Sequence, residues 1–181
     1  MTVTQIEPAG PGVLLAHAPR LHEIYRECFA GPPWSEPESR LADFPNHVRR
    51  QLSQPDAGGW LARSDGDIVG AVYGWAAPTQ LPRETPFDIA VADAVPPRVR
   101  PRMVAPALVV GELMVAESHR RQRIAARLLA AYVATAPAAW LITHRDGGAP
   151  AFYRRQGWRE DAAFVADGVP LLLFTWAQPR T

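Results

Sequence analysis

Three arginines cluster at one point of the chain, directly after an apolar run. The run ends at Val115, and after a short turn Arg120, Arg121 and Arg123 precede residues with helical spacing. The first backbone N–H groups of a helix have no partner inside it and, with the helix dipole, they favour an anion. Basic side chains oppose that dipole, so three of them here indicate an anion that offsets their charge. The segment therefore predicts a site for a phosphorylated cofactor.

A single carboxylate interrupts the apolar run itself. Glu112 shares a strand face with Val110 and Met114, where a charge is costly unless it is paired or faces a solvated cleft. Two interpretations stay open. Glu112 is either a general base that deprotonates an amine, directly or through water, or a carboxylate paired with a nearby arginine.

Apolar periodicity predicts the elements that carry these residues. Helical spacing covers residues 21–29, 41–52, 124–132 and 149–156, and strand-like runs cover residues 13–16, 60–62, 68–75, 108–115, 140–143, 162–166 and 170–176. Ser35 and Glu38 have the spacing of a capping box for the second helix, and Pro45 should kink or interrupt it. The order of these helices and strands predicts an α/β fold, with a mixed sheet and helices on its faces.

The proline-rich segment 78–106 carries seven prolines and no sustained period. It is interpreted as a long ordered loop inserted into a single domain that spans residues 1–181.

Bulk properties narrow the classes of function. A net charge of +1 gives no field that requires nucleic acid or an anionic membrane as a partner. No apolar run approaches the roughly 20 residues of a bilayer span, and one cysteine permits no internal disulfide, so a cytoplasmic protein is expected. The five histidines lack ligand-like spacing, so no metal is expected. Cys28 is interpreted as packing on the first helix.

Two motifs, in this order, resemble those of the GNAT superfamily of N-acetyltransferases. The first runs from a strand ending in valine, through a turn with arginine, into a helix; its matching positions are Val115, His119, Arg120, Ile124, Ala125, Leu128 and Leu129. The second combines an alanine, an aromatic–tyrosine pair and a glycine–aromatic pair; its matching positions are Ala149, Phe152, Tyr153, Gly157 and Trp158.

The resemblance implies a fold, a cofactor and a reaction. The fold is a mixed, mostly antiparallel sheet of about six or seven strands, splayed at the cofactor site and flanked by about four helices. The reaction is direct transfer of an acetyl group from acetyl-CoA to a primary amine. The implied cofactor-binding residues are Leu113, Met114, Val115, Arg120, Arg121, Gln122, Arg123, Ile124, Ala125, Ala126 and Tyr153.

The resemblance also suggests further roles. Tyr153 is the implied general acid for the leaving thiolate, and Glu112 is the candidate base. The expected acceptor-pocket residues are Trp34, Tyr73, Trp75 and His144. Arg123 stands where the family usually has glycine; the helical conformation expected there does not itself require glycine, and the guanidinium could either crowd or grip a phosphate.

The acceptor itself is not specified: a small-molecule amine and a protein or peptide amine both fit. Proteins of this type commonly form dimers, so a homodimer is an expectation that the resemblance allows. Two alternatives from other classes are a non-catalytic acyl-CoA-binding module and a nucleic-acid-binding protein that uses the basic patch; the near-zero charge argues against the second.

Overall fold

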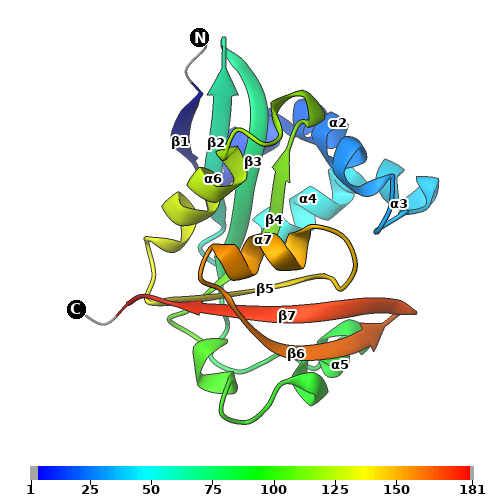
Figure 1. Cartoon of the computed structure of the whole chain (residues 1–181), viewed down its shortest axis with the longest axis vertical. Coiled ribbons are helices and arrows are strands. Elements are labelled where there is room, and N and C mark those ends of the chain that lie inside the picture. The colour runs from blue at the N-terminus through cyan, green and yellow to red at the C-terminus, as the bar shows by residue number, and fades with distance from the viewer. Residues whose placement is uncertain (1–3, 180–181) are drawn as a thin grey trace. The chain divides into compact units, whose positions relative to one another are not determined.

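The computed structural model describes residues 4–179, which contain seven strands, seven α-helices and two short 3-10 helices (Figure 1). The strands are β1 (Gln5–Ala9), β2 (Gly58–Ser64), β3 (Asp67–Ala76), β4 (Leu108–Val115), β5 (Ala138–His144), β6 (Arg159–Ala166) and β7 (Val169–Ala177). The helices are α1 (Pro11–Ala16), α2 (Ala18–Phe29), α3 (Glu38–Ala42), α4 (Phe44–Leu52), α5 (Pro86–Ala94), η1 (Arg100–Arg102), η2 (Glu117–His119), α6 (Ile124–Val133) and α7 (Ala149–Arg155).

The strands form one sheet in the hydrogen-bonded order β1-β2-β3-β4-β5-β7-β6. The pairs β1–β2, β2–β3, β5–β7 and β6–β7 are antiparallel, and β4–β5 is parallel. The parallel ladder is short, because it joins Leu108 to Ala139 and Val109 to Trp140. The mixed, mostly antiparallel sheet expected from the sequence is therefore confirmed.

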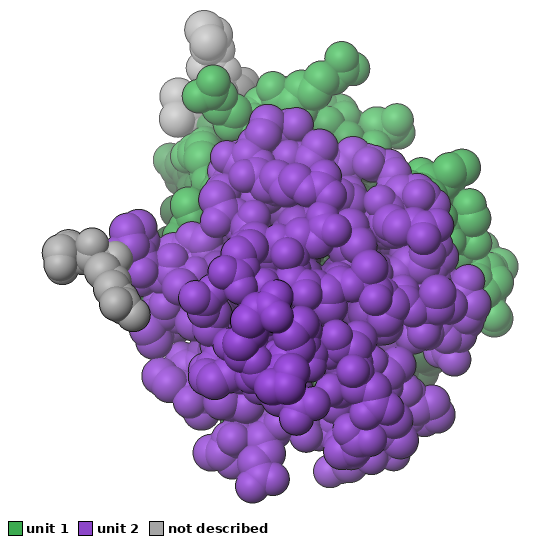
Figure 2. Space-filling view, turned by 60° about the horizontal axis from the view of Figure 1, so that its bottom comes forward, with its two compact units in different colours: residues 1–75, 110–135 green, residues 76–109, 136–181 purple. Residues whose placement is uncertain are grey.

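The chain divides into two compact units, coloured separately in Figure 2. The first unit comprises residues 1–75 and 110–135, and the second comprises residues 76–109 and 136–181. Strand β4 contributes to both, with Leu108 and Val109 in the second unit and the rest in the first. Each unit is described by itself below.

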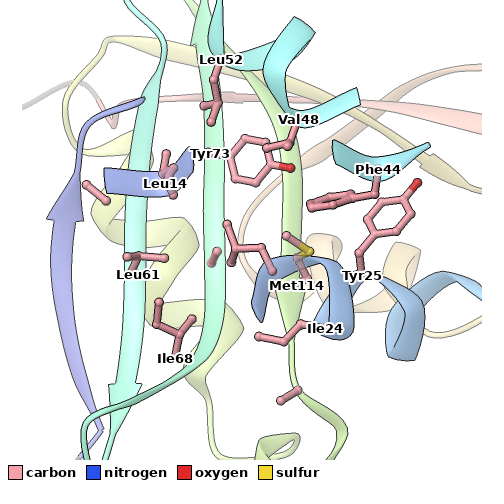
Figure 3. Packing of buried hydrophobic residues seen from close by; sticks show 14 of the residues in the cluster. Leu14, Ile24, Tyr25, Phe44, Val48, Leu52, Leu61, Ile68, Tyr73 and Met114 are labelled. Atoms are coloured by element: carbon pink, nitrogen blue, oxygen red, sulfur yellow. The ribbon is translucent and has the colours of Figure 1, made fainter. Parts of the chain in front are cut away.

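The core of the first unit holds the helices before β2 against one face of strands β2, β3 and β4 (Figure 3). Leu14, Ile24 and Phe44 come from three of these helices, and Tyr73 and Met114 come from β3 and β4; all five are at most 1% exposed. Each such side chain contributes about 1.5–3 kcal/mol through removal of apolar surface from water. This packing fixes the position of α4 relative to β4.

The opposite face of the same strands packs against α6. A Cβ added to Gly70 of β3 would lie 3.2 Å from Cδ1 of Leu128, whereas the neighbouring Ala71 belongs to the core on the other face. Alternate residues of β3 thus meet different helices, as the pleat of a strand requires. The apolar face expected for α6 is largely confirmed, since Ile124, Leu128 and Tyr132 are buried.

In the second unit, β5, β7 and β6 form an antiparallel arrangement with α7 against it. Tyr153 of α7 packs on Phe174 of β7 and on Trp158, with ring centroids 5.6 and 5.9 Å apart. Gly157 ends the helix region with a φ of 81°, as expected for a glycine just past a helix. A tight turn at Asp167 and Gly168 joins β6 to β7, the two strands expected over residues 162–166 and 170–176.

Several expectations about local structure are wrong. The apolar run 13–16 belongs to helix α1, not to a strand, and the first strand lies earlier, at Gln5–Ala9. Helix α3 begins after Pro37 without a side-chain cap, so the capping box predicted at Ser35 and Glu38 does not form. Helices α1, α3 and α5 raise the helix count above the expected four.

Two further segments differ in a way that prolines explain. The expected second helix is divided into α3 and α4 at Asp43, with Pro45 in the first turn of α4, where its missing N–H costs no hydrogen bond. The proline-rich segment 78–106 is not all loop: α5 begins at Pro86 under a capping box formed by Thr85 and Asp88. Within residues 4–179, every helix falls short of the length and apolar content that a membrane span requires.

Candidate active site

The segment between β4 and α6 has an unusual backbone. One turn of 3-10 helix, η2, follows β4, and Arg121 and Arg123 then take left-handed conformations, with φ of 62° and 60°. Side chains with a Cβ disfavour this region by about 1–2 kcal/mol. The expectation of ordinary helical geometry at Arg123 is therefore wrong, because Arg123 precedes the helix and adopts the conformation that glycine tolerates best.

This backbone leaves a row of amides without acceptors. Among the described residues, none accepts a hydrogen bond from the backbone N–H groups of Arg121 to Ala126. The first bond of α6 runs from the N–H of Arg127 to the carbonyl of Arg123, at 3.1 Å. Open amides at a helix start are the donors that phosphate groups bind. The anion site predicted from sequence thus has the backbone it needs.

The three arginines of this segment are not equivalent. The Arg120 guanidinium forms hydrogen bonds with two backbone carbonyls. Its Nη2 donates to the Glu27 carbonyl at 3.0 Å, and its Nε donates to the Val115 carbonyl at 3.5 Å. These contacts hold the Arg120 side chain against β4 and α2, and its contact with a cofactor stays a prediction. The Arg121 and Arg123 side chains are exposed and free to meet an anion.

Residues of helix α2 form hydrogen bonds with the segment between β4 and α6 and with the end of β4. The Glu27 carboxylate accepts from the N–H of Glu117 at 2.6 Å, and the Cys28 thiol donates to the Val115 carbonyl at 3.6 Å. Burial raises the pKa of the Cys28 thiol, although the Val115 bond and Arg120 act in the opposite direction. Cys28 is far from the motif along the chain but contacts it in space, which sequence distance could not reveal.

Glu112 has two partners on one helix. Its Oε1 lies 3.0 Å from His47 Nε2 and 3.3 Å from Gln51 Nε2, and the carboxylate-bearing side chain is 12% exposed. His47 and Gln51 stand one turn apart on α4, so both reach the same point of β4. The alternative in which an arginine pairs with Glu112 is wrong; the partners are a histidine and an amide.

Two tyrosines lie around this carboxylate. Tyr73 is completely buried, and its Oη has no hydrogen-bond partner among the described residues. Burial and the charge of Glu112 raise the pKa of Tyr73, and the same two causes raise the pKa of Tyr25, whose hydroxyl donates to Glu36 at 2.8 Å. The expectation that Tyr73 lines the acceptor pocket is wrong, because a fully buried side chain offers an acceptor no surface.

The two tryptophans expected at the pocket are partly exposed. Trp75 lies against Gly111 of β4 so closely that a Cβ there would be 2.6 Å from its Cζ3, so this position needs glycine. Trp34 follows the turn after α2 and meets the edge of Phe29, with centroids 5.7 Å apart. Both keep surface that an acceptor could contact, and their role stays a prediction.

The second unit holds the other two predicted residues. Tyr153 is 8% exposed, and its ring is held by Phe152, Trp158 and Phe174. His144 is 7% exposed at the end of β5, and its Nδ1 accepts from the N–H of Asp146 at 3.0 Å. That bond places the neutral ring's proton on Nε2. The catalytic role of Tyr153 and the acceptor contact of His144 stay predictions.

The backbone contacts expected of Leu113, Met114 and Val115 also stay predictions. Met114 and Val115 bury their side chains, at 1% and 8% exposure, so only their backbone could meet a cofactor. Among the described residues, no group of three or more metal-ligating side chains comes together.

Comparison with known proteins identifies the family. The profile of the acetyltransferase (GNAT) family matches residues 18–158, so this chain belongs to that family. No curated protein sequence matches the chain. The family resemblance drawn from the two motifs is thus confirmed.

Solved structures agree on the fold. An acetyltransferase from Thermus thermophilus is 18% identical with a TM-score of 0.63, over 98% of this chain and all of that one. An aminoglycoside 6'-acetyltransferase type Ii is 15% identical with a TM-score of 0.64, over 98% and 99%. The PaiA N-acetyltransferase from Thermoplasma acidophilum, in complex with coenzyme A, is 13% identical with a TM-score of 0.59, over 96% and 99%.

Proposed function

We propose that this protein transfers the acetyl group of acetyl-CoA directly to a primary amine. The observation that carries the proposal is the row of open amides from Arg121 to Ala126, placed after β4 at the position of the family's cofactor motif. The diphosphate of coenzyme A supplies the anion that these donors lack. Arg121 and Arg123 add two exposed cations, and the coenzyme A complex of a protein with the same fold supports the choice of ligand.

Different groups of the chain carry out the different steps of the proposed reaction. Backbone N–H groups at Leu113 to Val115 would polarise the acetyl carbonyl and stabilise the negative charge that develops on its oxygen. Glu112 takes the proton that the amine loses as its nitrogen bonds to the acetyl carbon. Tyr153 gives a proton to the sulfur as the carbon–sulfur bond breaks. The products are an amide and the free thiol of coenzyme A.

The acceptor is a small-molecule amine or the amine of a peptide or protein. Trp34, Trp75 and His144 are the side chains we expect it to contact. The described partners of Glu112 are an imidazole and an amide, so neither is a permanent cation that would suppress uptake of the amine's proton by the carboxylate.

The test is release of free thiol from acetyl-CoA in the presence of a panel of amines, with the acetylated product identified by mass spectrometry. Glu112→Gln and Tyr153→Phe should each lower kcat by about 10²-fold, the usual contribution of acid–base catalysis. Glu23→Gln, an exposed carboxylate on α2, is the matched control and should leave turnover unchanged.

Two outcomes oppose the proposal. Binding of coenzyme A without thiol release for any amine would favour the non-catalytic module. Full turnover in Tyr153→Phe, measured where chemistry limits the rate, would remove that residue from its role.

A further inference from the structure

We propose that His47 is a positioning residue for Glu112: with Gln51 it holds one carboxylate oxygen, so that the other oxygen alone accepts the proton of the acceptor amine. The inference deepens the proposed function and rests on Glu112 as the base of that reaction. Sequence reasoning gave His47 no role, because it lies 65 positions before Glu112.

The two carboxylate oxygens of Glu112 have different environments. His47 and Gln51 both approach Oε1, at 3.0 and 3.3 Å, whereas Oε2 has no partner among the described residues. Rotation of the carboxylate out of this orientation would break both contacts at once. The arrangement therefore fixes the position of the oxygen that stays available for proton transfer.

The helix that carries the two donors is anchored in the core. Phe44, Val48 and Leu52 of α4 are buried at 6% exposure or less, and they alternate with His47 and Gln51 along the helix. The donors thus stand on a rigid element and not on a loop. Rigid placement of hydrogen-bond donors is what precise orientation of a catalytic carboxylate requires.

The other groups facing Glu112 do not provide a competing charge. Tyr73 from β3 and Tyr25 from α2 have raised pKa values and stay neutral hydroxyls. Behind Tyr25, the carboxylate of Glu36 lies 3.9 Å from Arg40, which offsets its charge. His47 is consequently the ionisable side chain that contacts Glu112, and its ring is 32% exposed to solvent.

The direction of the hydrogen bond follows from chemistry. A carboxylate only accepts, so the His47 ring must carry its proton on Nε2 to bond Oε1. Loss of His47 should lower turnover, because the carboxylate loses the donor that orients it.

The kinetic test compares His47→Ala with His47→Gln, whose amide retains a donor. We expect His47→Ala to lower kcat on the order of 10-fold and to leave the KM for acetyl-CoA and the affinity for coenzyme A unchanged. His47→Gln should recover part of the lost kcat. His22→Gln is the matched control: His22 bonds the Leu41 carbonyl at 2.7 Å, away from Glu112.

A merely structural role would lower stability without lowering the kcat of the folded protein. If His47→Ala keeps the wild-type kcat while wild type releases thiol, the positioning role is refuted and the proposed function stands.

A second readout does not depend on activity. Nitrogen-15 NMR of the histidine rings should place the proton of neutral His47 on Nε2 and show slowed exchange of that proton, with the slow exchange lost in Glu112→Ala. A proton on Nδ1, or exchange that Glu112→Ala does not alter, overturns the inference. Absence of thiol release by wild type would refute the proposed function instead, and the ring spectrum still decides the hydrogen bond.

Discussion

The left-handed conformation of Arg123 makes a quantitative prediction about stability and cofactor affinity together. Arg123 precedes α6 with φ 60° and ψ 14°, and its exposed side chain forms no hydrogen bond or ion pair with another described side chain. Replacement by glycine removes a Cβ penalty of about 1–2 kcal/mol. Glycine also gains freedom in the unfolded chain, which costs about 0.5–1 kcal/mol.

The net expectation is a rise of about 0.5–1 kcal/mol in the free energy of unfolding for Arg123→Gly, or roughly 1–4 °C in Tm for a chain of this size. Arg123→Ala is the matched variant, because it removes the same guanidinium and keeps the Cβ. It should be no more stable than wild type. Urea unfolding followed by circular dichroism measures all three proteins under one condition.

The same pair of variants separates the backbone from the side chain in cofactor binding. If the guanidinium grips phosphate, glycine and alanine should weaken binding of coenzyme A alike, by about 3- to 10-fold. If the Cβ crowds the phosphate, Arg123→Gly should bind more tightly than Arg123→Ala. Equal stability of the glycine and alanine variants would refute the reasoning, since the left-handed backbone would then carry no cost.

Four other predictions follow from contacts in the first unit. Tyr73→Phe removes a buried hydroxyl without a partner among the described residues, so the free energy of unfolding should stay unchanged or rise by up to about 1 kcal/mol. Tyr25→Phe removes a hydrogen bond, so the free energy of unfolding should fall by about 1 kcal/mol. Urea unfolding measures both variants. Glu27→Ala removes the acceptor of the N–H group at the start of η2, so it should lower the free energy of unfolding by about 1 kcal/mol. It should also weaken coenzyme A binding, measured by calorimetry. Glu23→Ala, the control, should have neither effect. Because burial raises the pKa of Cys28, less thiolate is present at neutral pH; its alkylation should be about 10-fold slower in the folded protein than in guanidinium, and equal rates would contradict this.

Sequence reasoning succeeded where a long periodic pattern met a clear boundary. The helix after Arg123, the strand before it and the two strands on either side of Asp65 and Gly66 were all predicted, because each combines apolar periodicity with nearby turn residues. The open amides before Arg127 were expected from the same boundary, since an unpartnered helix start is a local property of the chain.

The wrong predictions of secondary structure fall where the apolar pattern is short or where prolines interrupt it. Strand β1 is half polar and contains Pro8, which a strand at the edge of a sheet tolerates because one side needs no donor. The four apolar residues in α1 could not be distinguished from a strand by period alone. For α5 the signal was present, since Thr85, Pro86 and Asp88 form a helix start, and the surrounding prolines obscured it.

The partners of Glu112 could not be predicted in principle from one sequence. His47 and Gln51 share a face of α4, but only the packing of that helix against β4 shows that the face meets a carboxylate. The left-handed backbone at Arg121 and Arg123 was likewise not predicted, because residue preference disfavours that conformation for arginine.

The most direct test of the central claim is a pair of two-dimensional amide NMR titrations, one with coenzyme A and one with pantetheine, which lacks the diphosphate. Coenzyme A should shift the backbone amide signals of Arg121 to Ala126 strongly, and pantetheine should leave them in place. Signals of these residues that stay unmoved by saturating coenzyme A would contradict the proposed cofactor site, and with it the proposed reaction.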